Sequence, residues 1–294
     1  MKKSWLAPYI ALGTVWGCSF IFIKLGLEFL TPFGVAFVRT LFGALALVTI
    51  LLIKKITIPK DPRIWAHLWV VSLLLNVVPG VLFAVAETKV TSILAGIINA
   101  VTPLMTLLVM MTLFREEKPK RYQVVGLLIG FGGVLTVLGA WNGLGSNPTV
   151  AILALLAAVT CYGFSFPYSR RYVLPNKLRP EALATTQVSL AAITLLPFFL
   201  FDGVTKYQIG LGPVLAMLAL GILGTGYAYI WNFKIMAAAG SAIASSVTYV
   251  TPVVAVIVGV IFLSESVTWN EPIGGAIVLL GVAISQGWIR LNRA

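Results

Sequence analysis

The sequence predicts an all-α membrane protein with ten transmembrane helices, arranged as two inverted five-helix repeats. Three observations predict this fold: an apolar composition, ten apolar runs of spanning length, and residues that recur at half the chain length. Of the 294 residues, 59% are hydrophobic and only 10% are charged. Water-soluble proteins have roughly 45–50% apolar and about 25% charged residues. The composition therefore favours a chain that lies in a lipid bilayer.

Each expected helix is an apolar run of about 20 residues, the length that crosses a hydrocarbon core ~30 Å thick. The ten runs are residues 5–26, 33–53, 65–86, 91–114, 121–140, 149–170, 182–201, 211–236, 242–263 and 270–289. The separators are short and hold helix breakers or charges, as at Thr31-Pro32 and Asp202-Gly203. The first run follows Met1-Lys2-Lys3 without a small-residue cleavage pattern, so we expect an uncleaved span.

Residues of the fourth and fifth runs recur in the ninth and tenth at a spacing of 149 positions. The recurring residues are Thr102-Pro103 with Thr251-Pro252, Glu116 with Glu265, and Gly132 with Gly281. A period of half the chain in an apolar protein is typical of secondary transporters built from internal repeats. We expect one repeat over residues 1–141 and the other over residues 142–294.

Lysine and arginine fall mainly on one side of the expected membrane. With the N-terminus in the cytoplasm, that side holds all of the 21 basic residues except Lys24, Arg39, Lys89 and Lys206. The positive-inside rule therefore predicts that both termini are cytoplasmic. Because five spans per half is an odd number, the second half enters the membrane from the opposite side, and the repeat is inverted.

Several functional classes have no support in the residues. The net charge of +12 lies in loops and is not interleaved with aromatics, which argues against nucleic-acid binding. Cys18 and Cys161 lie inside apolar runs and His67 is the only histidine, so we expect no metal site, cofactor or histidine catalysis. The phosphate-binding motif Gly-x-x-x-x-Gly-Lys-Ser/Thr is absent. The chain is therefore predicted to be a gradient-driven transporter and not an enzyme.

The motifs of both halves resemble those of the EamA-type transporters of the drug/metabolite transporter superfamily. The residues that carry the resemblance are Trp16-Gly17-Cys18-Ser19-Phe20 with Lys24, and the pairs Pro103/Glu116 and Pro252/Glu265. The second half departs from this pattern, with Tyr162-Gly163 in place of Trp16-Gly17. The resemblance implies a central cavity lined by the first, third, fourth, sixth, eighth and ninth helices, with the fifth and tenth at the periphery or at a dimer contact. Members move small metabolites across bacterial inner membranes, and they include aromatic amino acid exporters of the YddG type.

All nine acidic residues lie in loops or at expected helix ends; they are Glu28, Asp61, Glu87, Glu116, Glu117, Glu181, Asp202, Glu265 and Glu271. The small multidrug relatives in the superfamily use an intramembrane glutamate that exchanges a proton for a cation. This chain has no obvious equivalent, and Glu87 is the nearest to an exception. The pattern favours a facilitator or exchanger of neutral or zwitterionic solutes over a proton-driven drug pump.

Aromatic side chains are the first candidates for substrate binding. Most occur in pairs one helical turn apart, which places both rings of a pair on one helix face. The candidates are Trp16 and Phe20, Tyr162 and Phe166, Tyr227 and Trp231, and the single Tyr249. The alternative is packing or anchoring at the membrane interface, which accounts for most aromatics in membrane proteins.

Two amides and two prolines complete the expected cavity. Asn76 and Asn99 lie inside the third and fourth runs, where they would bind the polar end of a substrate or join two helices. Pro103 and Pro252 each remove a backbone hydrogen bond in mid-span, which frees carbonyls near Asn99 and Thr248. Interrupted helices at corresponding positions mark the midplane site in other inverted-repeat transporters. We expect a hinge or cavity role for both prolines, with a simple packing kink as the alternative.

Lys24 and Arg39 are expected near the outer face of the membrane. A gating role, in which they attract anionic groups or close the outer mouth, is one interpretation. The other is that they extend to the interface or pair with Glu28 or Glu87.

The sequence therefore predicts a multi-pass secondary transporter that exports or facilitates amino acids, aromatic ones among them, by alternating access. Its expected partners are a small-molecule substrate and the lipid bilayer. Two alternatives are an importer of a quaternary amine such as choline, bound in an aromatic cage, and a multidrug exporter. An intramembrane enzyme or a receptor is a rival of another class, but no catalytic grouping supports the first and the second needs no inverted repeat.

Overall fold

Helices account for nearly all of the chain that the structure describes, a computed structural model covering residues 5–114, 121–137, 141, 148–205, 210–264, 267–285 and 289. The helices of the first half are α1 (Leu6–Gly26), α2 (Pro32–Lys54), α3 (Pro62–Ser72), α4 (Val78–Glu87), α5 (Ser92–Asn99), α6 (Thr102–Thr112) and α7 (Arg121–Val137). Those of the second half are α8 (Thr149–Tyr168), α9 (Pro180–Asp202), α10 (Leu211–Gly221), α11 (Ala228–Ala239), α12 (Ser241–Ser246), α13 (Val250–Leu263) and α14 (Asn270–Ser285).

Short non-α turns join several of these helices into longer stretches. The π-helical turns η1 (Leu73–Val77) and η4 (Ile222–Tyr227) join α3 to α4 and α10 to α11. The π-helical turn η2 (Ser169–Val173) and the 3-10 turn η3 (Leu174–Asn176) follow α8. A second 3-10 turn, η5 (Val247–Tyr249), joins α12 to α13.

Eight helical stretches in the described residues are long and apolar enough to cross a membrane, and the chain is a multi-pass membrane protein. They are Leu6–Gly26, Pro32–Lys54, Pro62–Glu87, Ser92–Thr112, Thr149–Asn176, Pro180–Asp202, Leu211–Ala239 and Ser241–Phe262. Each overlaps one of the runs expected from the sequence. The remaining two expected spans correspond to the shorter helices α7 and α14, of 17 and 16 residues.

The helix starts follow directly from local sequence. Thr31, Asp61 and Thr91 each precede a helix, and each side-chain oxygen accepts a hydrogen bond from a backbone N–H of the first turn, at 2.8–3.2 Å. Proline follows Thr31 and Asp61 at the first helical position, where its missing N–H costs nothing. These caps explain why the expected boundaries lie close to the observed ones.

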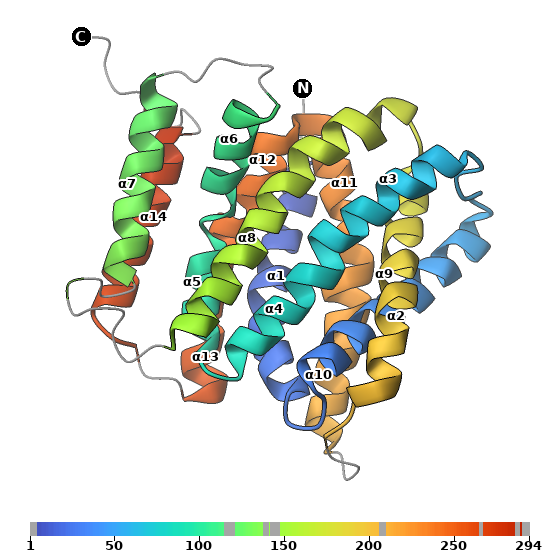
Figure 1. The fold of residues 1–294 in the computed structure, drawn as a ribbon, viewed down its shortest axis with the longest axis horizontal. Coiled ribbons are helices and arrows are strands. Elements are labelled where there is room, and N and C mark those ends of the chain that lie inside the picture. The colour runs from blue at the N-terminus through green and yellow to red at the C-terminus, as the bar shows by residue number, and fades with distance from the viewer. Residues whose placement is uncertain are drawn as a thin grey trace.

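Helix α1 packs against helices of both halves, including α5, α10, α11 and α13 (Figure 1). Gly13 and Gly17 face Val250 and Val254 of α13, where an added Cβ would overlap the valine side chains. These glycines therefore allow close approach of the two helices.

Helices α7 and α14 pack mainly against each other and stand apart from the other helices, as Figure 1 shows. Gly281 of α14 lies against the backbone of Gly130, and Gly133 lies against Val278. The peripheral position agrees with what the family resemblance implied for the fifth and tenth helices.

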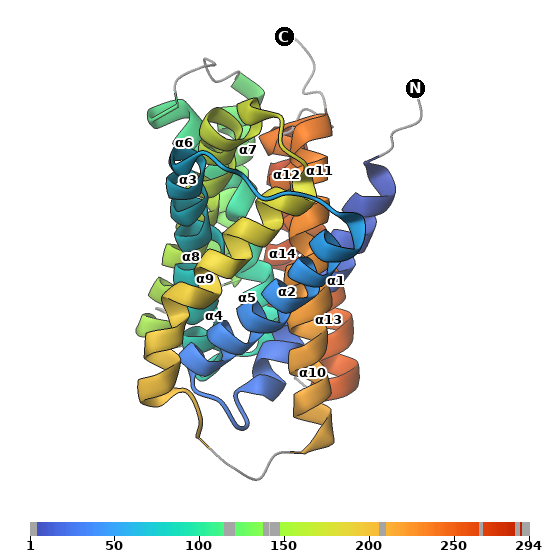
Figure 2. The same cartoon turned by 90° about the vertical axis from the view of Figure 1, so that its right-hand side faces the viewer.

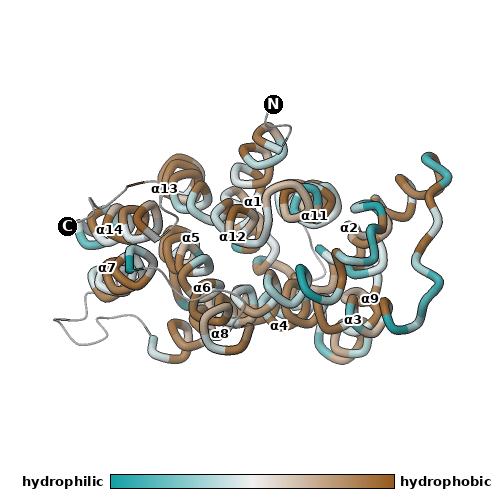
Figure 3. The backbone as a smooth tube through the Cα atoms, turned by 90° about the horizontal axis from the view of Figure 1, so that it is seen from above, coloured by the Kyte–Doolittle hydropathy of each residue, from teal (hydrophilic) through white to brown (hydrophobic). Residues whose placement is uncertain are grey.

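The chain enters α1 and leaves α14 at the same end of the bundle (Figures 1 and 2). Hydrophobic residues dominate the helices, and the link between α2 and α3 contains a hydrophilic stretch (Figure 3).

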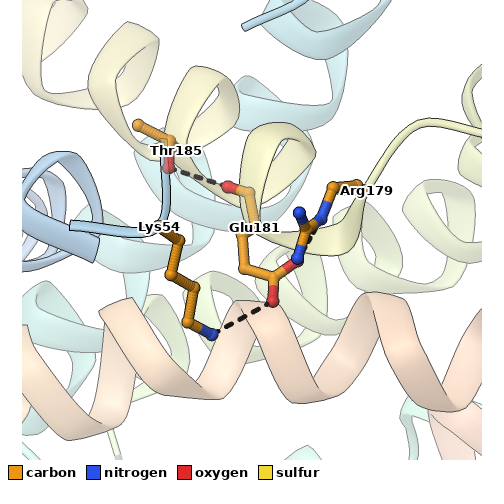
Figure 4. Close-up of polar contacts among 4 residues, drawn as sticks. All are labelled: Lys54, Arg179, Glu181 and Thr185. Carbon is orange, nitrogen blue, oxygen red and sulfur yellow. Dashed lines mark hydrogen bonds and ion pairs between the residues drawn. The ribbon is translucent and has the colours of Figure 1, made fainter. Parts of the chain in front are cut away.

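Lys54, which ends α2, pairs with Glu181 at the start of α9 at 3.5 Å, and Arg179 pairs with the same carboxylate at 3.8 Å (Figure 4). Both basic side chains are more than half exposed, so the pairs add little stability.

Candidate functional site

A cavity lies where the two halves meet, and every long apolar stretch of the described chain except α9 contributes to its wall. Its lining is Trp16, Ser19, Phe20, Ile23, Arg39, Leu75, Phe83, Asn99, Thr102, Tyr162, Phe166, Tyr229 and Thr248. The open volume at its centre is about 50 Å³, room for a few water molecules. The helices that line it are those implied by the family resemblance, with α2 added through Arg39.

Two aromatic side chains of the lining donate hydrogen bonds to backbone carbonyls of the π-helical turns. Trp16 Nε1 donates to Gly224 O in η4 at 3.2 Å, and Tyr229 Oη donates to Leu75 O in η1 at 2.8 Å. Pro79 has no N–H for Leu75 O four residues earlier, which leaves that carbonyl open to the tyrosine. Both bonds cross between the halves, and π-helical turns in helices occur often at functional sites.

A second pair of contacts joins each π-helical turn to the second helix of the opposite half. Arg39 Nε of α2 donates to Thr225 Oγ1 of η4 at 3.2 Å. Gln187 Nε2 of α9 donates to Asn76 Oδ1 of η1 at 2.6 Å. Asn76 and Thr225 are 149 positions apart, the period of the sequence repeat. The halves thus hold each other through equivalent polar contacts.

The Thr-Pro elements break their helices as expected. Helix α5 ends at Asn99 and α6 starts at Thr102, while η5 separates α12 from α13 just before Pro252. The Thr251 hydroxyl donates at 2.7 Å to Thr248 O, the carbonyl that Pro252 leaves without a helical partner. Asn99 Nδ2 reaches Thr251 Oγ1 at 3.4 Å, which is a long and weak contact.

The structure brings together five of the nine predicted binding residues in the cavity lining: Trp16, Phe20, Asn99, Tyr162 and Phe166. The other four lie outside it. Asn76 is buried against Gln187, and Tyr249 is buried in the core. Tyr227 is 39% exposed and contacts the ring of Trp231, so this pair fits the packing or interfacial interpretation.

The two basic residues expected at the outer face differ in placement. Arg39 lines the cavity. Lys24 Nζ instead donates to the backbone carbonyls of Glu87 and Val90 at 2.8 and 3.0 Å, at the end of α4. A lysine at this position satisfies free carbonyls and complements the partial negative charge at a helix C-terminus, which fits the structural interpretation.

Sequence reasoning missed seven lining residues: Ser19, Ile23, Leu75, Phe83, Thr102, Tyr229 and Thr248. Ser19 and Ile23 follow Trp16 on α1 within two turns and could have been added by helical spacing. Thr248 stands 149 positions after Asn99, so the repeat itself pointed to it. Nothing in the sequence pointed to Tyr229, because the direction in which this residue faces depends on the π-helical turn before it.

No acid lines the cavity, and the six acidic residues of the described chain lie at helix ends or between helices. Glu87 is the last residue of α4 and is fully buried. The expected positions of Glu116, Glu117 and Glu265 fall outside the described residues. Within the described chain, no group of three or more histidine, cysteine or acidic side chains could hold a metal ion.

Known proteins of the same kind match along the full chain. An uncharacterized transporter of Archaeoglobus fulgidus is 27% identical over 286 residues, covering 96% of this chain and 98% of its own. The uncharacterized inner membrane transporter YedA of Escherichia coli K12 is 28% identical, covering 94% and 89%. A solved crystal structure has the same fold, with a TM-score of 0.71 and 21% identity over 97% of both chains.

The sequence pattern of the EamA-like transporter family matches this chain twice, at residues 4–139 and 149–286. The two matches fall on either side of the link between α7 and α8, in agreement with the internal repeat. The chain is therefore a member of the EamA-like transporter family, a multi-pass membrane transporter.

Proposed function

We propose that the protein is a secondary transporter that moves small metabolites by alternating access, with amino acids, including aromatic ones, as its leading substrates. The observation that carries this proposal is the aromatic cavity at the contact of the two halves. Trp16, Phe20, Phe83, Tyr162 and Tyr229 offer ring faces to an apolar side chain, and polar groups lie beside them.

The transporter is proposed to have ten spans in two inverted repeats, with α7 and α14 as the fifth and tenth. The support is the matching of irregular features at 149 positions. Leu75 and Gly224 lie in the two π-helical turns, and Pro103 and Pro252 stand at the two helix breaks. Such features rarely recur at one period unless both halves share a fold, and an odd number of helices per half makes the repeat inverted.

Alternating access fits the small volume and the irregular turns. An open volume of about 50 Å³ is too small for an amino acid, so binding requires the walls to move. The helix breaks at Pro103 and Pro252 and the turns η1 and η4 lie beside the cavity and have weaker α-helical bonding than the neighbouring turns. These are the places where bending disturbs the fewest hydrogen bonds.

The proposed setting is the bacterial inner membrane with both termini in the cytoplasm. The distribution of lysine and arginine over the loops supports this orientation. An exporter or facilitator of neutral or zwitterionic solutes fits a cavity without acids better than a proton-driven drug exporter or a choline importer.

Uptake into liposomes tests the proposal. The purified protein is reconstituted, and entry of labelled amino acids is followed with and without a pH gradient. We expect saturable uptake of phenylalanine, tyrosine or leucine that is independent of the proton gradient. A double variant, Trp16→Ala with Tyr162→Ala, should lose most of this uptake, while Trp69→Ala on the exposed surface of α3 should keep it. Absence of uptake of every amino acid by wild-type protein would refute the proposal.

A further inference from the structure

Arg39 gives the cavity a positive charge that no neighbouring acid neutralises. It lies seven residues inside α2, so it stands about 10 Å from the start of that helix. No carboxylate of the described chain lies within ion-pair distance of its guanidinium. A charged side chain at this depth in a membrane helix is costly, and such residues usually serve a function.

The guanidinium of Arg39 is restrained at Nε, and its two terminal nitrogens are unpaired in the described chain. Nε donates to Thr225 Oγ1 at 3.2 Å, and the Thr225 hydroxyl donates in turn to Leu220 O at 3.0 Å. Thr225 therefore acts as an acceptor for Arg39 and restrains its Nε edge. In the described chain, the two terminal nitrogens of Arg39 have no hydrogen-bond partner, so four N–H groups remain available.

Tyr162 and Asn99 are further polar groups of the lining with unused hydrogen-bonding capacity in the described chain. The ring of Tyr162 stacks on Phe83 at 5.9 Å, while its hydroxyl has no hydrogen-bond partner among the described residues. Tyr162, Tyr229 and Arg39 all line the same cavity. The lining hydroxyls of Ser19 and Thr248 already donate to backbone carbonyls of their own stretches, at 2.9 Å each. The Thr102 hydroxyl contacts Asn99 Oδ1 at 3.4 Å.

We infer that Arg39 and Tyr162 form a carboxylate subsite, and that the substrate is a small organic acid with an apolar or aromatic body. This inference rests on the proposed function and names the chemical group that the cavity selects. A planar guanidinium binds a carboxylate through two parallel hydrogen bonds, and the Tyr162 hydroxyl supplies a third donor. The rings of Phe20, Phe83 and Phe166 would enclose the apolar body.

The amino group of an amino acid is not required in this arrangement. The lining offers no carboxylate to an ammonium group and places a fixed positive charge beside it. The cavity should therefore rank a monocarboxylate and an amino acid well above the amine that shares their aromatic body. The same charge disfavours a quaternary amine.

Binding to the full-length protein in lipid nanodiscs tests the subsite. The probes are 3-phenylpropanoate, L-phenylalanine and 2-phenylethylamine, which share one aromatic body and differ in charge. The dissociation constants are measured by calorimetry for wild type, Arg39→Gln and the control Arg63→Gln, which makes the same change at an exposed residue of α3. We expect Arg39→Gln to bind both carboxylates roughly 10- to 100-fold more weakly and Arg63→Gln to match wild type. Retention of carboxylate affinity within twofold in Arg39→Gln, or tightest binding of the amine by wild type, would overturn the inference.

Two milder variants keep the test decisive if Arg39→Gln does not fold. Tyr162→Phe removes the third donor, and Thr225→Val removes the acceptor that positions Arg39. Both variants should bind the carboxylates several-fold more weakly and bind the amine as wild type does. If neither variant changes carboxylate affinity, the inference is overturned. The liposome assay distinguishes the two proposals. Carboxylate binding that depends on Arg39, without any flux, would refute the transport proposal and support the carboxylate subsite. Flux that does not depend on Arg39 would support transport and refute the subsite.

Discussion

The carbonyls of Leu75 and Gly224, 149 positions apart, each accept a hydrogen bond from an aromatic side chain of the opposite half. Tyr229 reaches back to the first half, and Trp16 reaches forward to the second. The two bonds tie the π-helical turns to the cavity wall in a reciprocal way. A movement of one half against the other must break or replace them, so they favour the conformation described here.

Tyr229→Phe removes one of these ties and keeps the ring. The buried Leu75 carbonyl then loses its donor. The free energy of unfolding should fall by about 1 kcal/mol, the usual net contribution of one hydrogen bond. Thermal unfolding in detergent measures the effect. Tyr172→Phe, at a more exposed position on η2, is the control and should unfold as wild type does.

Asn76 and Gln187 should show strong energetic coupling. Both are buried and joined at 2.6 Å, so Asn76→Leu or Gln187→Leu alone leaves an unpaired amide and costs roughly 1–3 kcal/mol. The double variant leaves no unpaired partner and should cost less than the sum of the two. A double-mutant cycle of unfolding free energies gives the coupling. Strictly additive effects would mean that the contact contributes nothing to stability.

Pro252→Ala should reduce transport by restoring a backbone N–H opposite Thr248 O. The carbonyl now accepts from the Thr251 hydroxyl, and an N–H in place of proline would compete for it and straighten the helix. We expect the maximal flux to fall several-fold with folding retained. Pro252→Gly also restores the N–H but keeps the turn easy to bend, so it should transport better than Pro252→Ala. Equal flux in wild type and both variants would assign Pro252 to packing alone.

Adjacent glycines of α7 provide a matched test of the α7–α14 contact. At Gly133 an added Cβ would lie 2.6 Å from Val278 N, whereas at Gly132 nothing lies within 4 Å. Gly133→Ala should therefore destabilise the protein by about 1–3 kcal/mol. Gly132→Ala should be neutral or stabilise it by up to ~1 kcal/mol through helix propensity. Thermal unfolding of the two variants compares them directly, and equal stabilities would contradict the close packing.

The sequence predicted the helices well because each is set by local features. Apolar runs, N-terminal caps and prolines fix where a span starts and ends, and the starts at Pro32 and Pro62 follow such caps. The repeat also placed Trp16 and Tyr162 on equivalent helices, and both residues line the cavity. These inferences needed no knowledge of how the helices pack.

Arg39 and Tyr229 were misjudged because their surroundings come from distant parts of the chain. The interfacial interpretation of Arg39 offered Glu28 or Glu87 as its partner, while its hydrogen-bond acceptor is Thr225 of the other half. Tyr227 and Trp231 share a face that turned out to lie outside the cavity. Tyr229 lies about 200° around the helix from Tyr227, and no hydrophobic periodicity revealed which face turns inward after η4.

The two π-helical turns also set the angular phase of the helices that contain them. A π-helical turn holds one residue more than the α-helical turn it replaces, and one residue rotates a helix by about 100°. Residues after η1 and η4, Phe83 and Tyr229 among them, therefore face the cavity only because the extra residue is present. Loss of one residue at either turn would shift the helix end by merely ~1.5 Å, yet it would present a different set of side chains to the solute. Single-residue insertions and deletions at these two points are thus a route by which related proteins could acquire new substrates while keeping the same bundle.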